Sequence, residues 1–151
     1  ISTMFYSYKR IGPISTGHRQ YKADSHCRWV HGYGRYVELK FACDERDEKG
    51  WVYDFGNLKW FKKWLEQQWD HKVLVAHDDP ALLRLKELEK EDIVKLNVMP
   101  EEYGPGIEDS CRYVFDYANP HIISQTNGRV WIERVRIWEH ENNYAEYVWV
   151  K

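Results

Sequence analysis

The segment from Arg35 to Cys43 alternates between two kinds of side chain, and this alternation constrains the fold more than any other part of the chain. Its odd-numbered positions include Val37, Leu39 and Phe41, and charged residues stand between them. Successive side chains of a β-strand point to opposite faces, so the pattern predicts a half-buried strand. The strand is expected to begin at about His31.

Other apolar runs, separated by Gly, Pro and charged turns, complete the predicted element order. Strands are predicted at 4–11, 31–43, 129–139 and 144–150, and helices at 55–68, 80–91 and 107–117. Gly12-Pro13 is expected to end the first strand, and Asn119-Pro120 to end the third helix. The order β-β-α-α-α-β-β predicts one α+β domain over residues 1–151. Its helices should pack on one face of a four-stranded antiparallel sheet.

The predicted helices carry apolar residues at helical spacing. The stripe of the first helix consists of Phe55, Leu58, Phe61, Leu65 and Trp69. In the second helix, Leu82, Leu85 and Leu88 are expected to face inward. Trp60 and Trp64 lie off the first stripe, and two large aromatic residues there indicate a covered surface. The cover is either another subunit or a loop of the same chain.

Composition excludes several classes of protein. A formal net charge of -2 argues against binding to a nucleic-acid backbone. No apolar run is long enough for a transmembrane helix, and the first residues show no signal-peptide pattern. The three cysteines, Cys27, Cys43 and Cys111, form an odd and widely spaced set that fits reduced thiols. We therefore expect a cytoplasmic protein that binds neither nucleic acid nor membranes.

The string Cys-Arg-Trp-Val-His-Gly-Tyr places three chemically capable side chains close together. Cys27 precedes His31 by four residues, and Tyr33 follows at the same strand parity. Two metal-capable groups on one strand face, with a thiol nearby, indicate a site. Spacing alone also permits a buried thiol and a histidine that makes an ordinary surface hydrogen bond.

Several separated motifs together resemble one family. The string Cys27-x-x-x-His31-Gly32 resembles the CxxxHGH motif of the 6-carboxytetrahydropterin synthases, a branch of the 6-pyruvoyltetrahydropterin synthase family. The other similar pieces are His18-Arg19, Gly50 to Phe55, Asp70-His71-Lys72, and the hairpin from Val135 to Tyr147. Their order and spacing agree with the family over residues 18–147.

The resemblance implies a fold, an assembly and a reaction. The fold is the tunnelling fold, whose antiparallel sheets join between subunits into a barrel, usually in a hexamer of two trimers. The substrate is 7,8-dihydroneopterin triphosphate. The carboxy branch eliminates triphosphate and releases acetaldehyde, leaving 6-carboxytetrahydropterin on the route to 7-deazaguanines such as queuosine. We expect a homohexamer with shared active sites, in which Glu139 of one chain lies opposite Cys27 of another.

The resemblance also assigns the proton-transfer residues. Cys27 would be the general base, which requires that part of the thiol ionises near neutral pH. His71 would be its partner and proton relay, and Asp70 would orient His71. The alternative for Asp70 and His71 is an ordinary helix C-terminus, where the macrodipole favours histidine.

Two carboxylates are the expected pterin-binding groups. Glu139 would accept two parallel N–H bonds from the 2-amino-pyrimidinone edge. Since Glu139 shares strand parity with Val135 and Ile137, it points toward the apolar side and needs a partner. The alternative partner is a basic side chain. Glu108 resembles the glutamate that frames the pterin ring, although the Ser or Thr that precedes it in the family is missing here.

The expected cofactor is zinc, which the family holds with three histidines. His18 and His31 match two of these ligands, and Tyr33 stands at the third position. Three outcomes are open. Tyr33 is the third ligand, another group such as His26 or His77 takes its place, or the metal is bound weakly or not at all.

Two rival functions remain open. One is a 6-pyruvoyltetrahydropterin synthase, although the three-residue spacer between Cys27 and His31 favours the carboxy branch. The other is a non-catalytic protein that binds a pterin or purine and has lost the zinc centre.

Overall fold

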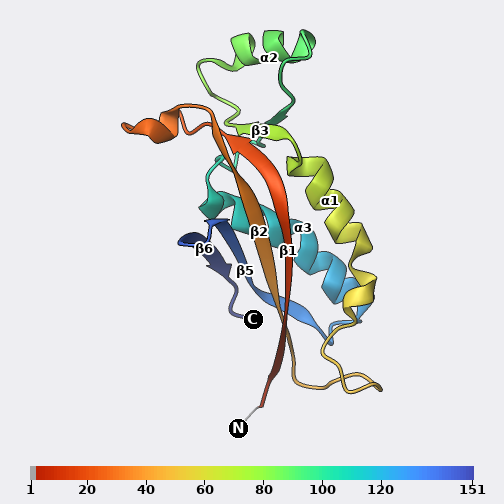
Figure 1. The fold of residues 1–151 in the computed structure, drawn as a ribbon. Coiled ribbons are helices and arrows are strands. Elements are labelled where there is room, and N and C mark those ends of the chain that lie inside the picture. The colour runs from red at the N-terminus through yellow and green to blue at the C-terminus, as the bar shows by residue number, and fades with distance from the viewer. Residues whose placement is uncertain (1–2) are drawn as a thin grey trace.

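The computed structural model describes residues 3–151 and forms six strands and three α-helices (Figure 1). The strands are β1 (Phe5–His18), β2 (His31–Cys43), β3 (Lys72–Val75), β4 (Leu96–Val98), β5 (Trp131–His140) and β6 (Asn143–Val148). The helices are α1 (Lys59–Trp69), α2 (Leu82–Lys90) and α3 (Ile107–Gln125), with short 3-10 turns η1 (His26–Arg28) and η2 (Phe55–Asn57).

All six strands form one sheet in the order β4-β3-β1-β2-β5-β6. The four predicted strands are β1, β2, β5 and β6, which are adjacent and antiparallel. The α+β class is therefore confirmed, and the predicted count of four strands is wrong. The additional strands β3 and β4 pair in parallel beside the end of β1. With four and three residues, they are too short to show a periodic pattern.

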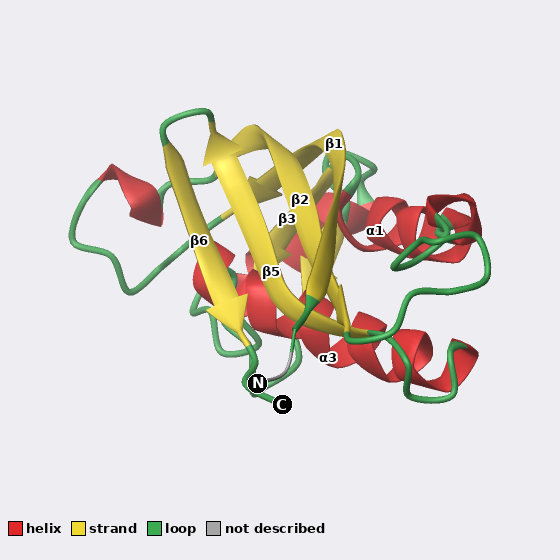
Figure 2. Cartoon of the chain, turned by 90° about the horizontal axis from the view of Figure 1, so that it is seen from below, coloured by secondary structure: helices red, strands yellow, loops and turns green. Residues whose placement is uncertain are grey.

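Helices α1 and α3 cover one face of the sheet, and no helix of the described part of the chain covers the opposite face of β1, β2, β5 and β6 (Figure 2). The alternation in β2 places Val37, Leu39 and Phe41 in the core, as predicted. Leu58 and three residues of α1, Phe61, Leu65 and Trp69, are buried against them. Phe55 belongs instead to η2 and is exposed.

Strand β1 continues beyond Gly12-Pro13, so the predicted end of the strand is wrong. The register with β2 shifts between Ile11 and Ile14 and then resumes as far as His18. A bulge accommodates the proline, which has no N–H to donate. Gly12 has a φ of 136°, and a Cβ atom there would come within 2.6 Å of the carbonyl oxygen of Arg35. The extended β1 brings His18 opposite His31.

Two helix predictions are also wrong in part. Helix α3 passes through Pro120 and ends at Gln125, and its buried face continues beyond the proline to Ile122. The side chain of Asn119 accepts a hydrogen bond from the N–H of Ile132. Helix α2 contains no buried residue, so its leucines do not face the core. Figure 1 shows the reason, since α2 stands beyond the end of the sheet. None of the helices within residues 3–151 is long and apolar enough to cross a membrane.

The surface around Trp60 and Trp64 is covered, as predicted, and the cover is helix α3 of the same chain. The ring of Trp64 stacks on Tyr117 with centroids 3.9 Å apart. The ring of Trp60 stacks on His121 at 5.0 Å. Neither a loop nor a second subunit is needed to explain these two aromatic residues.

Candidate active site

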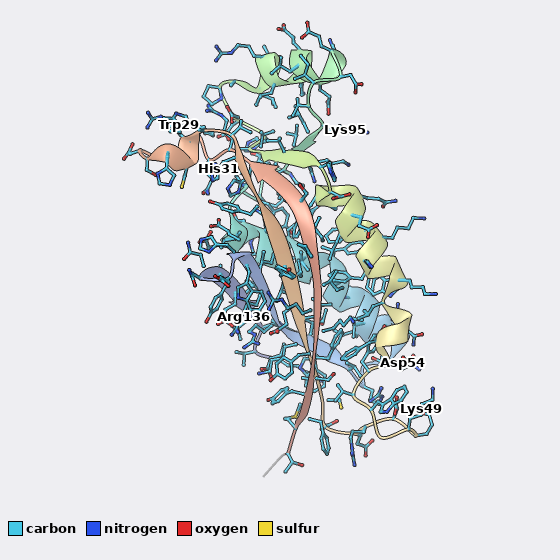
Figure 3. The ribbon with its side chains drawn as sticks, in the orientation of Figure 1. Trp29, His31, Lys49, Asp54, Lys95 and Arg136 are labelled. Atoms are coloured by element: carbon cyan, nitrogen blue, oxygen red, sulfur yellow. The ribbon has the colours of Figure 1, made fainter. Side chains whose placement is uncertain are left out.

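His18 and His31 form a close pair at one end of the sheet. The two residues are register partners on β1 and β2, and their Nε2 atoms lie 3.0 Å apart. His31 Nδ1 donates a hydrogen bond to the carbonyl oxygen of Trp29 over 2.6 Å. This bond fixes the ring, and in the neutral tautomer it leaves Nε2 as the acceptor nitrogen. Figure 3 shows Trp29 and His31 together at this end, far from Lys49 and Asp54.

A buried arginine lies directly behind His18. Only 1% of Arg35 is exposed, and it donates to Ser110 Oγ over 3.0 Å and to His18 Nδ1 over 3.2 Å. Within residues 3–151, no carboxylate lies in ion-pair distance of its guanidinium group. Burial, followed by the charge of Arg35, lowers the pKa of His18 to about 4. His18 is therefore neutral near pH 7.

Arg35 was not identified as a functional residue from the sequence. The signal was present, because Arg35 has the same strand parity as Val37, Leu39 and Phe41. A charged residue at a buried position of an amphipathic strand indicates a partner or a function.

Tyr33 lies beside both histidines. Its ring makes edge contacts with His18 and His31, with centroids 5.8 Å and 5.4 Å away. Burial, and then the charges of Glu139 and Cys27, raise the pKa of Tyr33. The same chain therefore brings Cys27, Tyr33 and Glu139 to one corner. Within one chain, Glu139 and Cys27 both lie close enough to Tyr33 for their charges to raise its pKa. The expectation that Glu139 of one chain lies opposite Cys27 of another stays a prediction.

The histidine pair fits a metal ion, and the third family ligand is missing. Two nitrogens that ligate one tetrahedral zinc lie roughly 3.3 Å apart, close to the 3.0 Å found here. Tyr33 supplies the third candidate donor. The described part of the chain contains no group of three or more His, Cys, Asp or Glu residues that could hold a metal. His26 and His77 are both exposed, and neither completes the pair.

Cys27 lies in η1, within the segment that joins β1 to β2. Its side chain is half-buried, and its carbonyl oxygen accepts a hydrogen bond from the N–H of Gln20 over 3.2 Å. Cys43 and Cys111 are buried in the core, so the three thiols form no common site.

The two carboxylates predicted to bind a pterin line one cavity of about 370 Å³. Glu108 stands in the first turn of α3, and Glu139 stands where the register of β5 with β6 is irregular. Gln20, Asn142 and Asn143 line the same cavity, and the sequence had not pointed to Gln20. No ion pair of Glu139 is present in residues 3–151, so the alternative of a salt bridge is not realised. The acceptor atoms of both carboxylates remain available to a ligand.

Asp70 and His71 form a pair immediately after α1. Asp70 Oδ1 lies 3.0 Å from His71 Nδ1, and His71 has a φ of 58°. This left-handed conformation turns the ring back toward Asp70, which neighbours within a helix cannot achieve. The side chain of His71 is 79% exposed and lies in a shallow cavity that is also lined by His31 and Tyr33. Glu108 and Glu139 line a separate cavity, so no single cavity of this chain contains all the predicted site residues.

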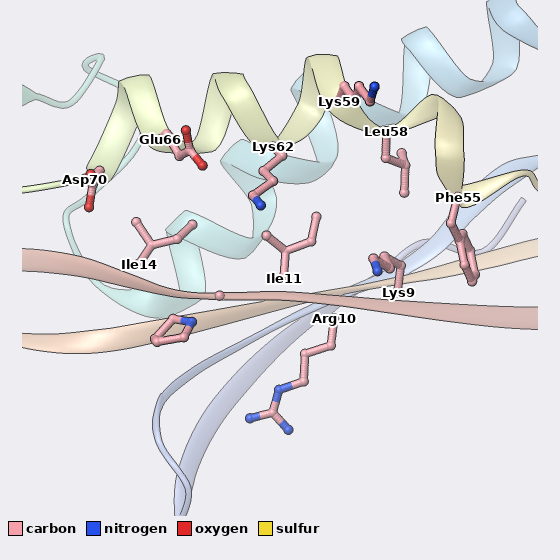
Figure 4. Close-up of a pocket in the computed structure, with 12 residues that line it drawn as sticks. Lys9, Arg10, Ile11, Ile14, Phe55, Leu58, Lys59, Lys62, Glu66 and Asp70 are labelled. Carbon is pink, nitrogen blue, oxygen red and sulfur yellow. The ribbon is translucent and has the colours of Figure 1, made fainter.

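A third cavity, of about 520 Å³, lies between β1 and α1 (Figure 4). Lys9, Lys59 and Lys62 line one part of it, and Glu66 and Asp70 line the other. Asp70 is the only predicted site residue there, so this groove is adjacent to the Asp70-His71 pair and distinct from the carboxylate cavity.

The fold and these groups define an α+β protein with a histidine pair at the sheet end and a cavity lined by two carboxylates. The chain belongs to the 6-pyruvoyl tetrahydropterin synthase family, whose model matches residues 8–149.

Curated relatives carry the name 6-carboxy-5,6,7,8-tetrahydropterin synthase. The protein from Rickettsia typhi is 25% identical over 88% of this chain and 93% of its own length. The one from Aquifex aeolicus is 26% identical over 80% of this chain and 75% of its own. The match to the Rickettsia conorii protein is 34% identical and spans 46% of this chain and 51% of that relative.

Solved structures share the fold. An uncharacterized protein from Wolinella succinogenes superposes with a TM-score of 0.83 at 18% identity, over 97% of this chain and 99% of that one. The 6-pyruvoyl tetrahydropterin synthase of Caenorhabditis elegans gives a TM-score of 0.59 at 19% identity, over 98% and 97% of the two chains.

Proposed function

We propose that this protein is a lyase that converts 7,8-dihydroneopterin triphosphate and one water molecule to 6-carboxytetrahydropterin, acetaldehyde and triphosphate. The observation that carries the proposal is the cavity lined by Glu108 and Glu139 beside the corner that holds Cys27 and the histidine pair. The names of the curated relatives support the same reaction. The product would enter a cytoplasmic route to 7-deazaguanines.

The carboxylates would bind and orient the substrate. Glu139 accepts hydrogen bonds from the amino group and ring N–H of the pterin, which fixes the plane and direction of the ring. Glu108 accepts from the same polar edge. This orientation places the substrate side chain toward Cys27, which removes a proton from it as general base. His71, oriented by Asp70, acts as the proton relay: it accepts the proton that Cys27 removed and donates it again as triphosphate leaves.

His18 and His31, with Tyr33 as third donor, would hold the zinc ion. When bound, the metal would supply Lewis-acid polarisation of the oxygen atoms on the substrate side chain. The bond from His31 to the carbonyl of Trp29 orients this ligand, as second-shell contacts of metal-binding histidines do.

The position of His71 favours a site shared between copies of the chain. His71 and Glu139 line separate cavities, so the Asp70-His71 pair of a second copy would complete the site. Two strand edges allow such an assembly. Among the described residues 3–151, β6 pairs only with β5, and β1 from Phe5 to Ile14 pairs only with β2. We propose a homo-oligomer closed through these edges, with a hexamer as the expected size.

A pterin-binding protein without turnover is the second candidate. Two specific features favour it, since Tyr33 replaces a histidine and the buried cation of Arg35 contacts His18. Both would weaken a metal centre and leave the acceptor atoms of Glu108 and Glu139 in their cavity.

Incubation with 7,8-dihydroneopterin triphosphate, followed by mass spectrometry, tests the proposal. Formation of 6-carboxytetrahydropterin with release of acetaldehyde and triphosphate is expected. A Glu139→Gln variant should lose activity, and Glu141→Gln in the exposed hairpin is the matched control. Formation of 6-pyruvoyltetrahydropterin would assign the other branch, and binding without any product would support the second candidate.

A further inference from the structure

The segment 19–30 carries the proposed base Cys27, yet it contains little regular structure. Figure 1 shows this segment projecting from the end of the sheet. Its one element, η1, has three residues and buries none of them. A general base must nevertheless be held in place, because a misplacement of roughly 1 Å can lower a rate about a hundredfold. The question is which contacts fix the position of Cys27.

Three consecutive carbonyl oxygens around Cys27 accept hydrogen bonds. The carbonyl of Cys27 accepts from the N–H of Gln20 over 3.2 Å, and that of Trp29 accepts from His31 over 2.6 Å. The carbonyl of Arg28 accepts from Nη1 of Arg19 over 2.8 Å. The guanidinium of Arg28 itself bonds to the carbonyl of Asp24, within the same segment. Arg19 is therefore a side chain that connects the centre of this segment to the rest of the fold.

The other end of Arg19 is attached to a buried carboxylate. Its Nε donates to Asp79 Oδ2 over 2.8 Å, and the side chain of Asp79 is 0% exposed. Asp79 is itself fixed, because its Oδ1 accepts from the N–H of Ala81 over 2.8 Å. The backbone N–H of Arg19 also bonds to the carbonyl of Leu74 in β3. One planar guanidinium thus joins the residue after Cys27 to the segment between β3 and α2, as its forked geometry permits.

We propose that Arg19 is a positioning residue for Cys27: it links the carbonyl of Arg28, the next residue, to the buried carboxylate of Asp79. This inference rests on the proposed role of Cys27 as general base. Arg19 acts through the carbonyl of Arg28 and does not contact the substrate. Loss of its side chain would release the middle of the segment while the carboxylates of the pterin cavity stay in place.

The kinetic test compares Arg19→Gln, Arg19→Lys and Asp79→Asn with the wild type. Arg84→Gln, on the exposed helix α2, is the matched control. In Arg19→Gln we expect kcat to fall about a hundredfold with KM for the pterin substrate within about twofold, because orientation is lost and binding is kept. Arg19→Lys should recover part of kcat, since an ammonium group can pair with Asp79 but lacks the fork that also reaches Arg28. A role in stability alone would not produce this split or this rescue.

A second test does not depend on pterin turnover. Cys43 and Cys111 are buried, and burial raises the pKa of Cys111 to about 12, so alkylation by iodoacetamide reports on Cys27. In Arg19→Gln the rate should rise on the order of threefold, because local opening exposes a half-buried thiol. Mass spectrometry of the labelled peptide identifies the site, and circular dichroism checks the fold of each variant.

The outcomes separate this inference from the proposed function. If the wild type shows no turnover but Arg19→Gln and Asp79→Asn accelerate labelling of Cys27, the proposed reaction fails and the positioning contact stands. If kcat and labelling are both unchanged in folded Arg19→Gln, the inference is wrong. Should Arg19→Gln not fold, Arg19→Lys decides: wild-type kcat and labelling in that variant overturn the proposal.

Discussion

The guanidinium of Arg35 donates a hydrogen bond to Nδ1 of His18, although the usual partner of a metal-binding histidine at this position accepts one. A donor on Nδ1 leaves the ring proton on Nε2, the atom that faces His31. The carbonyl oxygen of Pro105 also lies 3.3 Å from the same Nδ1 atom. Two alternative partners thus compete for one nitrogen and decide which atom of His18 is free to bind a metal.

Replacement of Arg35 by Met should therefore increase zinc affinity. Without the guanidinium, the Pro105 carbonyl can accept the Nδ1 proton, and Nε2 becomes the free donor. The change should be about tenfold or more, the range typical of second-shell substitutions. Competition with a chromophoric chelator measures it, with Arg136→Met on the open face of the sheet as control. Equal or weaker affinity in Arg35→Met would show that Arg35 does not oppose the metal.

Tyr33→His should produce a more strongly bound zinc ion than the wild type. A third imidazole completes a set of three neutral donors with an open position, and the metal no longer has to ionise a phenol whose pKa is raised by its surroundings. Elemental analysis after gel filtration should find about one zinc per chain in the variant. Tyr36→His, on the opposite face of β2, is the matched control. Similar metal content in both variants would argue against a ligand position at Tyr33.

The free energy of unfolding of the metal-free protein should fall as the pH is lowered below 6.5, the pKa of His18 in the unfolded chain. The folded pKa of His18, about 4, lies below the unfolded value of 6.5, so the unfolded chain binds more protons between these limits. The contribution of neutral His18 is fully present above pH 6.5 and declines toward pH 4, by about 2 to 3 kcal/mol. Urea unfolding at several pH values measures this slope, and His18→Gln should flatten it. Parallel slopes for the two proteins would contradict the assignment.

Cys27→Ala and Glu139→Gln should separate turnover from binding. Cys27→Ala removes the base and should keep pterin affinity. Glu139→Gln removes a charged acceptor worth about 1.5 to 3 kcal/mol, so the Kd should rise roughly 10- to 100-fold. Titration with neopterin, followed by fluorescence, gives the affinities, and Glu141→Gln serves as control. Near wild-type turnover in Cys27→Ala would exclude Cys27 as the base.

The sequence predicted the parts of the fold that repeat over many residues. The alternation around Val37 identified β2, and the spacing of Phe61 and Leu65 identified the buried face of α1. The short strands β3 and β4 were not predicted. Strand β3 is stabilised by pairing with β1, and β4 by pairing with β3, and no local sequence pattern indicates such pairing. The sequence predicts that a strand ends at Pro13 and a helix before Pro120, but a bulge in β1 and the long helix α3 accommodate these prolines.

The candidate site was predictable where it depends on parity and motif. Glu108 and Glu139 do line one cavity, and His18 does meet His31. The contacts of Arg35 and Arg19 were not foreseen, because their partners Ser110 and Asp79 lie far away in the sequence. Only tertiary structure brings such partners together.

A mixing experiment should show whether Asp70-His71 and Cys27 of one site come from different chains. Co-expression of Cys27→Ala with His71→Ala gives mixed assemblies. A site in them is intact when the His71→Ala chain supplies Cys27 and the Cys27→Ala chain supplies His71. Random assembly should then restore about a quarter of wild-type activity from two inactive parents. Cys27→Ala co-expressed with Glu139→Gln is the control. Because Cys27 and Glu139 both lie near Tyr33 of the same chain, this mixture should add no activity beyond that of the Glu139→Gln parent. Activity that stays at the level of the parents in the first mixture would contradict the shared site and place the whole reaction within single chains.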